Sequence, residues 1–234
     1  MRKLLVSLAL AASALVAAPA ANAAAVVVWG ERFPLSTIDN FYDSLTGVTS
    51  TIAGGTLDTV DLTGVGLLWA VQPADAYTPA ELTTMASFLA GGGRIAFMGE
   101  HGGFAPDENN RINTALSTLG ATISITNNAL SCGFRDAERA TGEIKDHSLT
   151  TGVDLYQYAC FAQLNVSGTA QVLMTGDTGS DGDGIPMMAY QNIGPGSVFL
   201  ITDQNVWDGQ PSGWPGYDNA RMFENLLLGD TGAP

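Results

Sequence analysis

The chain has 234 residues, of which 46% are hydrophobic and 14% charged, and its formal net charge at pH 7 is −14. Nucleic acids and anionic membrane surfaces would be repelled by this charge, so neither is expected as a partner. The charge is compatible with cation binding, and also with a solvated acidic surface, which is the simpler interpretation.

Residues 1–23 have the pattern of a secretory signal peptide. Arg2-Lys3 is a positive start, an apolar run follows from Leu4 to Ala18, and Ala21-Asn22-Ala23 is a small-residue cleavage motif. The apolar run is short for a membrane span, and no other run reaches that length. We therefore expect cleavage after Ala23, a periplasmic or extracellular location, and no membrane span in the mature chain.

The first half of the mature chain alternates between apolar strands and capped helices. The segment Phe88–Gly103 shows this best, because a helix stops at three glycines, a strand follows, and the strand ends in Gly99-Glu100-His101-Gly102-Gly103. Thr78-Pro79-Ala80-Glu81 is a capping box. The patterns predict strands at 25–29, 48–52, 65–71, 94–98 and 122–126, and helices at 36–45, 79–90 and 107–119. This order is typical of a parallel, doubly wound sheet.

The second half begins with residues 127–153, which lose this rhythm and which we interpret as a long insertion. Later patterns predict strands at 161–166, 171–175, 186–191 and 197–202, a helix at 218–228, and a frayed tail at 230–234. The segment Asp177–Gly184 looks like a calcium loop at first, but it lacks the full ligand set, so a hairpin turn is expected and weak calcium binding is the alternative. The predicted fold class is α/β: three layers, with a mostly parallel flavodoxin-like sheet and an antiparallel extension in the C-terminal half.

The two cysteines are Cys132 and Cys160. In an oxidising compartment a disulfide between them is expected, which would close a loop of nearly thirty residues and tie the insertion back to the segment near Cys160. The alternative is a reactive thiol, although neither cysteine lies on a strand-to-helix turn.

Glu100 and His101 follow a buried strand directly, and open α/β sheets bind their ligands at the carboxyl ends of strands. One interpretation makes His101 a general base or ligand and Glu100 an acid or cation ligand. In the other, Glu100 caps the next turn and His101 is a solvated loop residue.

Three segments resemble the class I glutamine amidotransferase-like superfamily, in its non-amidotransferase branches, which include trehalose-utilisation (ThuA-like) proteins and GldG-type domains. Gly91–His101 is similar to a helix, glycine, strand and histidine segment of ThuA-like proteins. Asp146-His147-Ser-Leu-Thr-Thr-Gly152 looks like their turn with serine in place of proline, and Gly194–Asp203 with residues 219–228 looks like their final strand and helix. The resemblance implies one domain over residues 24–229.

The sequence departs from the superfamily at its nucleophile. Members that hydrolyse glutamine carry a cysteine on the turn after the central strand, and here that turn is Gly99–Gly103, without cysteine. Glutaminase activity by the family mechanism is therefore not expected.

If the sheet closes as the resemblance implies, Glu31, Gln72, Glu100 and Asp203 ring one crevice at the carboxyl edge. Such a ring could hold Ca²⁺ or Mg²⁺ through oxygen ligands, or supply an acid and base for glycoside chemistry. The alternative is that strand ends are polar in every α/β protein. No cofactor is certain, and a divalent cation is one option.

Trp207, Trp214 and Tyr217 lie in a loop close to Asp203 in sequence. Exposed aromatic rings there could stack on sugars, or the rings could cover the crevice as packing. The full set of candidate ligand-binding residues is Glu31, Gln72, Gly99, Gly102, Asn205, Trp207 and Trp214, beside Glu100, His101 and Asp203 as candidate catalytic residues.

The leading functional prediction is an exported protein that binds a small polar ligand, such as a carbohydrate, at this edge. The first alternative is a hydrolase that uses Glu100, His101 and Asp203, with or without a metal ion. The second is an interaction module of the cell envelope, whose partner would be another envelope protein.

Overall fold

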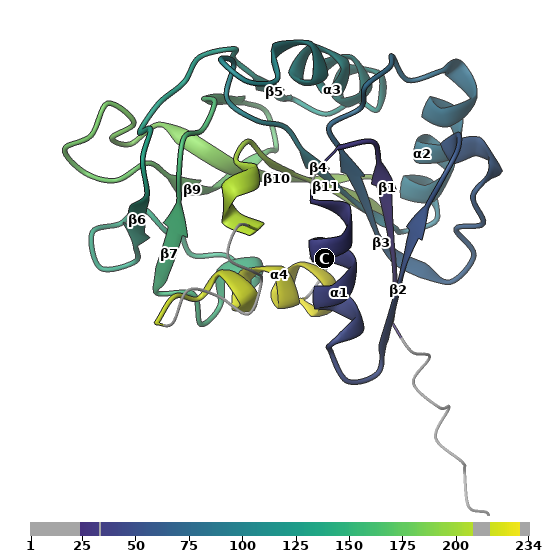
Figure 1. Ribbon diagram of the computed structural model, residues 1–234, viewed down its shortest axis with the longest axis horizontal. Helices are drawn as coiled ribbons and strands as arrows, with labels where there is room; N and C mark the ends of the chain where they lie inside the picture. The colour runs from purple at the N-terminus through teal and green to yellow at the C-terminus, as the bar shows by residue number, and fades with distance from the viewer. Residues whose placement is uncertain (1–23, 33, 208–215, 230–234) are drawn as a thin grey trace, which may run out of the picture.

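The computed structural model describes residues 24–32, 34–207 and 216–229, so the predicted leader and tail lie outside it. Seven strands form the main sheet in the order β2-β1-β3-β4-β11-β10-β9 (Figure 1). The strands are β1 Ala24–Gly30, β2 Val48–Ala53, β3 Val65–Val71, β4 Arg94–Met98, β5 Ile123–Ile125, β6 Arg135–Glu138, β7 Leu155–Tyr158, β8 Leu164–Val166, β9 Gln171–Thr175, β10 Pro186–Ile193 and β11 Gly196–Ile201. The helices are α1 Leu35–Asp43, α2 Pro79–Ala90, α3 Pro106–Thr118 and α4 Asn219–Leu228, with short 3-10 helices η1 Leu57–Thr59, η2 Ser148–Thr150 and η3 Gln204–Trp207.

The sheet is parallel from β2 to β11 and antiparallel beyond it. β1 pairs in parallel with β2 and β3, and β4 pairs in parallel with β3 and β11. β10 pairs antiparallel with β11 and with β9. The predicted fold class, with its antiparallel C-terminal extension, is therefore confirmed.

Helices cover both faces of the sheet, which makes three layers. Alternate side chains of β3 face opposite layers, as the period of a strand requires: Trp69 belongs to the core under α1 and α4, and Leu68 to the core under α2 and α3. Figure 1 shows α1 and α4 together on one side of the strands.

The local sequence patterns predicted the central strands and the start of α2 correctly. β3 and β4 have the predicted bounds, because each is a continuous apolar run closed by polar residues or glycine. The capping box is present: the Thr78 hydroxyl accepts from the Glu81 amide, and the Glu81 carboxylate accepts from the Thr78 amide. The connection from β9 to β10 is the predicted hairpin.

The predictions differ from the structure at the short strands outside the main sheet. The strand predicted at 122–126 is β5, which does not extend the main sheet and instead pairs antiparallel with β8. The strand predicted at 161–166 is the shorter β8, and the insertion contains β6, which pairs with β7 and was missed. These strands are three or four residues long, and their partners are distant in sequence, so local patterns carry little signal for them.

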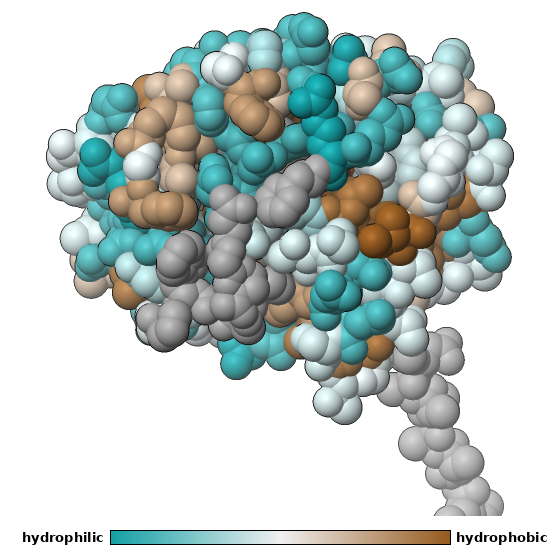
Figure 2. Space-filling view, in the orientation of Figure 1, coloured by the Kyte–Doolittle hydropathy of each residue, from teal (hydrophilic) through white to brown (hydrophobic). Residues whose placement is uncertain are grey.

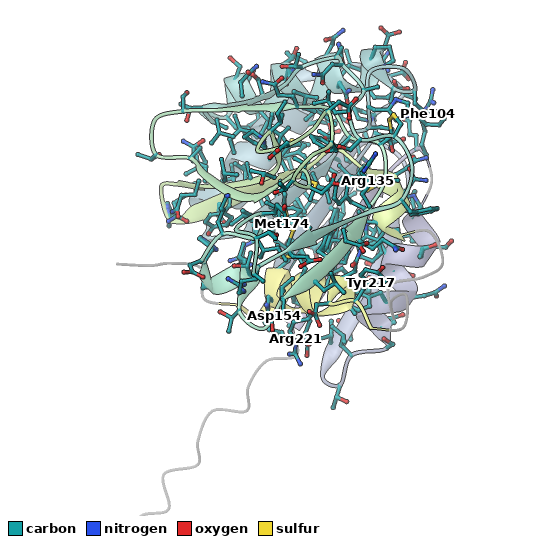
Figure 3. The ribbon with its side chains drawn as sticks, turned by 90° about the vertical axis from the view of Figure 1, so that its left-hand side faces the viewer. Phe104, Arg135, Asp154, Met174, Tyr217 and Arg221 are labelled. Carbon is teal, nitrogen blue, oxygen red and sulfur yellow. A yellow bond between two sulfur atoms is a disulfide. The ribbon has the colours of Figure 1, made fainter. Side chains whose placement is uncertain are left out.

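The start of α4 is fixed to the outer strand β7. The Asp218 carboxylate accepts from the Asp154 and Leu155 amides, and the Asn219 side chain exchanges two hydrogen bonds with the Gln157 backbone. Figure 3 shows Asp154, Tyr217 and Arg221 close to one another at this end of the molecule.

The surface drawn in Figure 2 is mostly hydrophilic or neutral, with separate hydrophobic areas. Among the described residues, the large apolar side chains that are exposed are Ile52, Phe104, Phe134 and Leu228. No helix in the described part of the chain is long and apolar enough to cross a membrane.

Candidate functional site

The carboxyl ends of the three central parallel strands are level with one another. The Gln72 amide, just after β3, donates to the Met98 carbonyl of β4, and the Gly99 amide donates to the Ile201 carbonyl of β11. Residues that follow these strands are therefore neighbours, and we call this region the carboxyl edge.

Glu100 is the central residue of the carboxyl edge, and it is 1% exposed. Its Oε1 accepts from the His101 amide at 2.7 Å, and its Oε2 accepts from the Gln204 amide at 2.9 Å. The carboxylate therefore fixes the start of η3 beside the end of β4. Glu100 acts here as a cap for neighbouring backbone, which is one of the two roles the sequence left open.

Asn109 of α3 holds Glu100 in place from the other side. Its side-chain oxygen accepts from the Glu100 amide, and its side-chain nitrogen donates to the Glu100 carbonyl and to Asn127 Oδ1. A Cβ at Gly99 would lie 2.5 Å from Asn109 Oδ1, so this glycine serves close packing. The sequence around Asn109 carries no signal for a site role, since an asparagine near a helix start is most simply a cap.

Gln72 is buried and has a strained backbone. Its φ is +33°, an uncommon value for a residue other than glycine. Its side-chain nitrogen donates to Gln204 Oε1 at 2.8 Å, whereas its Oε1 has no hydrogen-bond partner among the described residues. The strain and the buried oxygen lie at the predicted edge, and such features concentrate at functional sites.

Asp203 follows β11 and is also 1% exposed. Its Oδ2 accepts from the Ala159 amide at 2.6 Å, and its Oδ1 accepts from the Asn205 amide at 2.8 Å. Burial, and then the charge of Asp203, raise the pKa of Tyr156 well above its usual value. Tyr156 thus lies within the electrostatic influence of Asp203, a relation that no local pattern of the sequence indicates.

His101 lies between the buried carboxylate and solvent, with a side chain that is 25% exposed. Its Nε2 is 3.9 Å from Glu100 Oε1, which is too long for a hydrogen bond. Burial lowers the pKa of His101 below 6.5, whereas a nearby carboxylate would raise it. Burial dominates at this separation, so the imidazole is neutral at pH 7.

The carboxyl edge contains buried polar atoms that have no hydrogen-bond partner among the described residues: Gln72 Oε1, His101 Nδ1, Tyr156 Oη and Trp207 Nε1. Buried polar atoms are usually paired, because leaving one unpaired costs about 1–3 kcal/mol. Four at one region of the fold therefore need an explanation.

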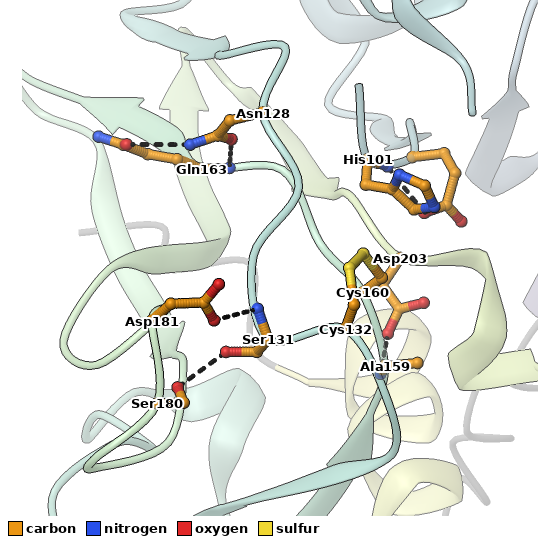
Figure 4. The surroundings of a disulfide bond; sticks show 11 residues. His101, Asn128, Ser131, Cys132, Ala159, Cys160, Gln163, Ser180, Asp181 and Asp203 are labelled. Carbon is orange, nitrogen blue, oxygen red and sulfur yellow. Dashed lines mark hydrogen bonds and ion pairs between the residues drawn. A yellow bond between two sulfur atoms is a disulfide. The ribbon is translucent and has the colours of Figure 1, made fainter. Parts of the chain in front are cut away.

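The disulfide predicted between Cys132 and Cys160 is present, and it lies beside His101 and Asp203 (Figure 4). The adjoining segment 127–128 packs against the His101 loop. The Gly102 amide donates to the Asn128 carbonyl at 2.7 Å, and a Cβ at Gly102 would meet the Asn127 backbone. Gly102 therefore permits a close backbone approach, a structural reason for the glycine.

The structure decides the setting of two predicted ligand-binding residues. Trp207 is 1% exposed and stacks on Phe223 with ring centroids 4.1 Å apart, so of the two roles left open by the sequence it has packing and not an exposed platform for a sugar. Burial of a large ring offered more free energy than exposure. Glu31 is exposed, unlike the buried carboxylates Glu100 and Asp203. Trp214 lies outside the described residues.

The described residues contain no cluster of three or more histidine, cysteine, aspartate or glutamate side chains that could hold a metal ion. Several cavities formed by the described residues lie away from the carboxyl edge. One of about 550 Å³, lined by Val60, Phe88 and Gly93, is at the amino ends of β3 and β4, and another of about 320 Å³ is lined by Arg135, Glu143 and Asp177. The carboxyl edge is distinguished by its buried polar atoms without partners among the described residues and by the strained backbone of Gln72, and not by the size of a cavity.

Solved structures share this fold at low sequence identity. The mmIFT52 N-terminal domain is 16% identical over 87% of this chain and 96% of its own, with a TM-score of 0.63. A ThuA-like protein from Bacteroides uniformis is 11% identical over 90% of this chain and 91% of its own, with a TM-score of 0.55.

A β-galactosidase from Rahnella sp. R3 is 13% identical over 88% of this chain, with a TM-score of 0.54, and this chain spans only 31% of that enzyme. No protein-family model and no curated protein matches the sequence. These similarities show a fold that ThuA-like proteins share, as the resemblance in the sequence predicted.

Proposed function

We propose that the protein is an exported binding protein of the non-amidotransferase, ThuA-like kind, and that it takes a small polar ligand at the carboxyl edge. The observation that carries this proposal is the group of buried polar atoms near Glu100 and Asp203 that have no hydrogen-bond partner in the described part of the chain. A ligand that pairs these atoms would recover the free energy that their burial costs.

The chemistry of these atoms favours a ligand with hydroxyl groups. Gln72 Oε1 is an acceptor, and Tyr156 Oη and Nδ1 of the neutral His101 ring can each donate or accept, depending on hydroxyl orientation and tautomer. Sugar hydroxyls donate and accept, so a carbohydrate matches such a mixed set. The likeness to a β-galactosidase and to an exo-β-1,4-mannosidase supports the same class.

Export is supported by two independent features. The first 23 residues have the signal-peptide pattern, and the Cys132–Cys160 disulfide is of the kind that persists in oxidising compartments.

The hydrolase alternative receives less support from the geometry. Glu100 and Asp203 each accept two main-chain hydrogen bonds, so both carboxylates already serve the local fold. His101, whose side chain is 25% exposed and whose ring is neutral, would be the base. This alternative and the envelope-module alternative both stay predictions.

Thermal unfolding with a panel of galactose, mannose, trehalose and glucuronate tests the proposal. A ligand at one hundred times its Kd adds about 2.7 kcal/mol, which raises Tm by roughly 5–10 °C for a domain of this size. We expect one compound to produce such a shift in the wild type and none in Glu100→Gln or His101→Ala.

Glu143→Gln is the matched control. Glu143 is also buried and also accepts two main-chain hydrogen bonds, from Glu138 and Thr178, but it belongs to the insertion. It should lose stability as Glu100→Gln does while it keeps the ligand shift. A shift that survives in both Glu100 and His101 variants would contradict the proposed site.

A further inference from the structure

The Cys132–Cys160 disulfide joins two chain segments that each hold one part of the carboxyl edge. Residues 127–128 contact the His101 loop through the Gly102 amide, which donates to the Asn128 carbonyl, and they contact α3 through Asn127, whose side chain accepts from Asn109. Residue 159 contacts the other part, through the Ala159 amide and the Asp203 carboxylate. Figure 4 shows the sulfur pair beside His101 and Asp203.

The two segments are also joined by hydrogen bonds that do not depend on the disulfide. Leu130 and Phe161 exchange two main-chain hydrogen bonds of 2.9 and 3.1 Å, and β6 pairs with β7 nearby. The Asn128 side chain also accepts from the Gln163 amide. Loss of the cross-link would therefore loosen the region locally and leave the main sheet folded.

The backbone next to the disulfide is strained, and this strain favours local loosening when the cross-link is lost. Ser131 is 1% exposed and has φ of +49°, the left-handed region that residues other than glycine rarely adopt. Its amide donates to Asp181 at 2.6 Å, and its hydroxyl is 2.8 Å from the Ser180 hydroxyl. A strained residue held by its surroundings relaxes when one of the constraints is removed.

The disulfide is open to attack on one side. Cys132 is exposed, whereas Cys160 is 8% exposed. Reduction of a disulfide proceeds by attack of a thiolate on an accessible sulfur. Because Cys132 is the more exposed residue of the pair, we assign its sulfur as the one that a reductant attacks, with Cys160 as the leaving group.

We propose that the Cys132–Cys160 disulfide is a redox clasp on the carboxyl edge: the oxidised form holds the His101 loop and Asp203 in their relative positions, and reduction by a dithiol releases them. The idea that this disulfide regulates ligand binding rests on the proposed function. The dithiol forms a mixed disulfide with Cys132 while Cys160 leaves as a thiolate and takes a proton. The second thiol then displaces Cys132, so two electrons pass to the protein and the reductant becomes a disulfide.

Amide hydrogen exchange tests the clasp without any ligand. The reporters are the Gly102, Ala159 and Gln204 amides, and the internal controls are the amides of β1 and β3. On reduction of the folded protein with dithiothreitol, we expect at least tenfold faster exchange at the reporters and less than twofold change at the controls. The double variant Cys132→Ser/Cys160→Ser should show the reduced pattern and should not respond to dithiothreitol.

Three results would overturn the clasp: reporter exchange that does not change, exchange that accelerates equally in β1 and β3, or a disulfide that dithiothreitol reduces only in denaturant. The sugar panel, run on oxidised and reduced protein, separates the two proposals. Equal Tm shifts in both states would reject the clasp as a regulator and keep the binding site. Faster reporter exchange with no shift for any sugar would keep the clasp and reject the proposed ligand class.

Discussion

His101 illustrates how a single residue depends on its surroundings. Two effects oppose each other there, because burial favours the neutral imidazole and Glu100 at 3.9 Å favours the charged one. Burial lowers the pKa of His101, and it also lowers the pKa of His147, the other histidine, with a contribution from Arg94. Both histidines are therefore neutral at pH 7.

These lowered values predict a pH dependence of stability. Below pH 6.5 the unfolded chain binds more protons than the folded chain, so the free energy of unfolding should fall as pH decreases from 6.5 through the lowered pKa values. Urea unfolding between pH 5 and 7.5 measures this slope, and His101→Gln should reduce it.

NMR titration of the His101 ring gives the independent check, with an expected midpoint below 6.5. A midpoint above 6.5 would mean that the effect of Glu100 on the pKa exceeds that of burial.

At the scale of elements, α2 is fixed by its first turn. Thr78 and Glu81 cap each other, and Glu81 also accepts from the Leu57 amide, which attaches η1 to the helix. The same four residues that predict the helix start therefore also connect two elements, and only the second role depends on the fold.

Replacing Thr78 by alanine should lower the free energy of unfolding by about 1 kcal/mol, because the Glu81 amide loses its acceptor. Thr83→Ala is the control, since Thr83 lies on the exposed face of the same helix. Chemical unfolding of both variants decides the matter, and equal losses would show that the cap contributes nothing specific.

At the scale of the whole molecule, Trp207 joins the carboxyl edge to the core beneath α1 and α4. Its ring contacts Phe41, Trp69 and Phe223, which come from three different elements. The packing of η3, and through it the position of Gln204 against Glu100, depends on this ring.

Trp207→Ala should therefore cost about 3–5 kcal/mol of unfolding free energy, the usual loss for a buried aromatic ring. Phe104→Ala, at a ring that is 52% exposed, should change stability by less than about 0.5 kcal/mol. If Trp207→Ala lowered the free energy of unfolding, measured with urea, no more than Phe104→Ala does, the ring would not be a core residue.

The sequence by itself determined the elements and which side of each is buried. Apolar runs such as 65–71 and 94–98, and the cap at Thr78, act within a few residues, so their signals are complete locally. Even the polar strand ends were predictable, because parallel strands share an edge.

The tertiary structure decided which of the polar residues at the strand ends contact one another. Gln72 and Gln204 form a hydrogen bond across 132 residues of sequence, and Asn109 reaches Glu100 from a separate helix. It also moved Trp207 into the core and β5 out of the main sheet. Such outcomes follow from competition for burial and pairing among segments far apart in the chain, and no local pattern records which segment is favoured.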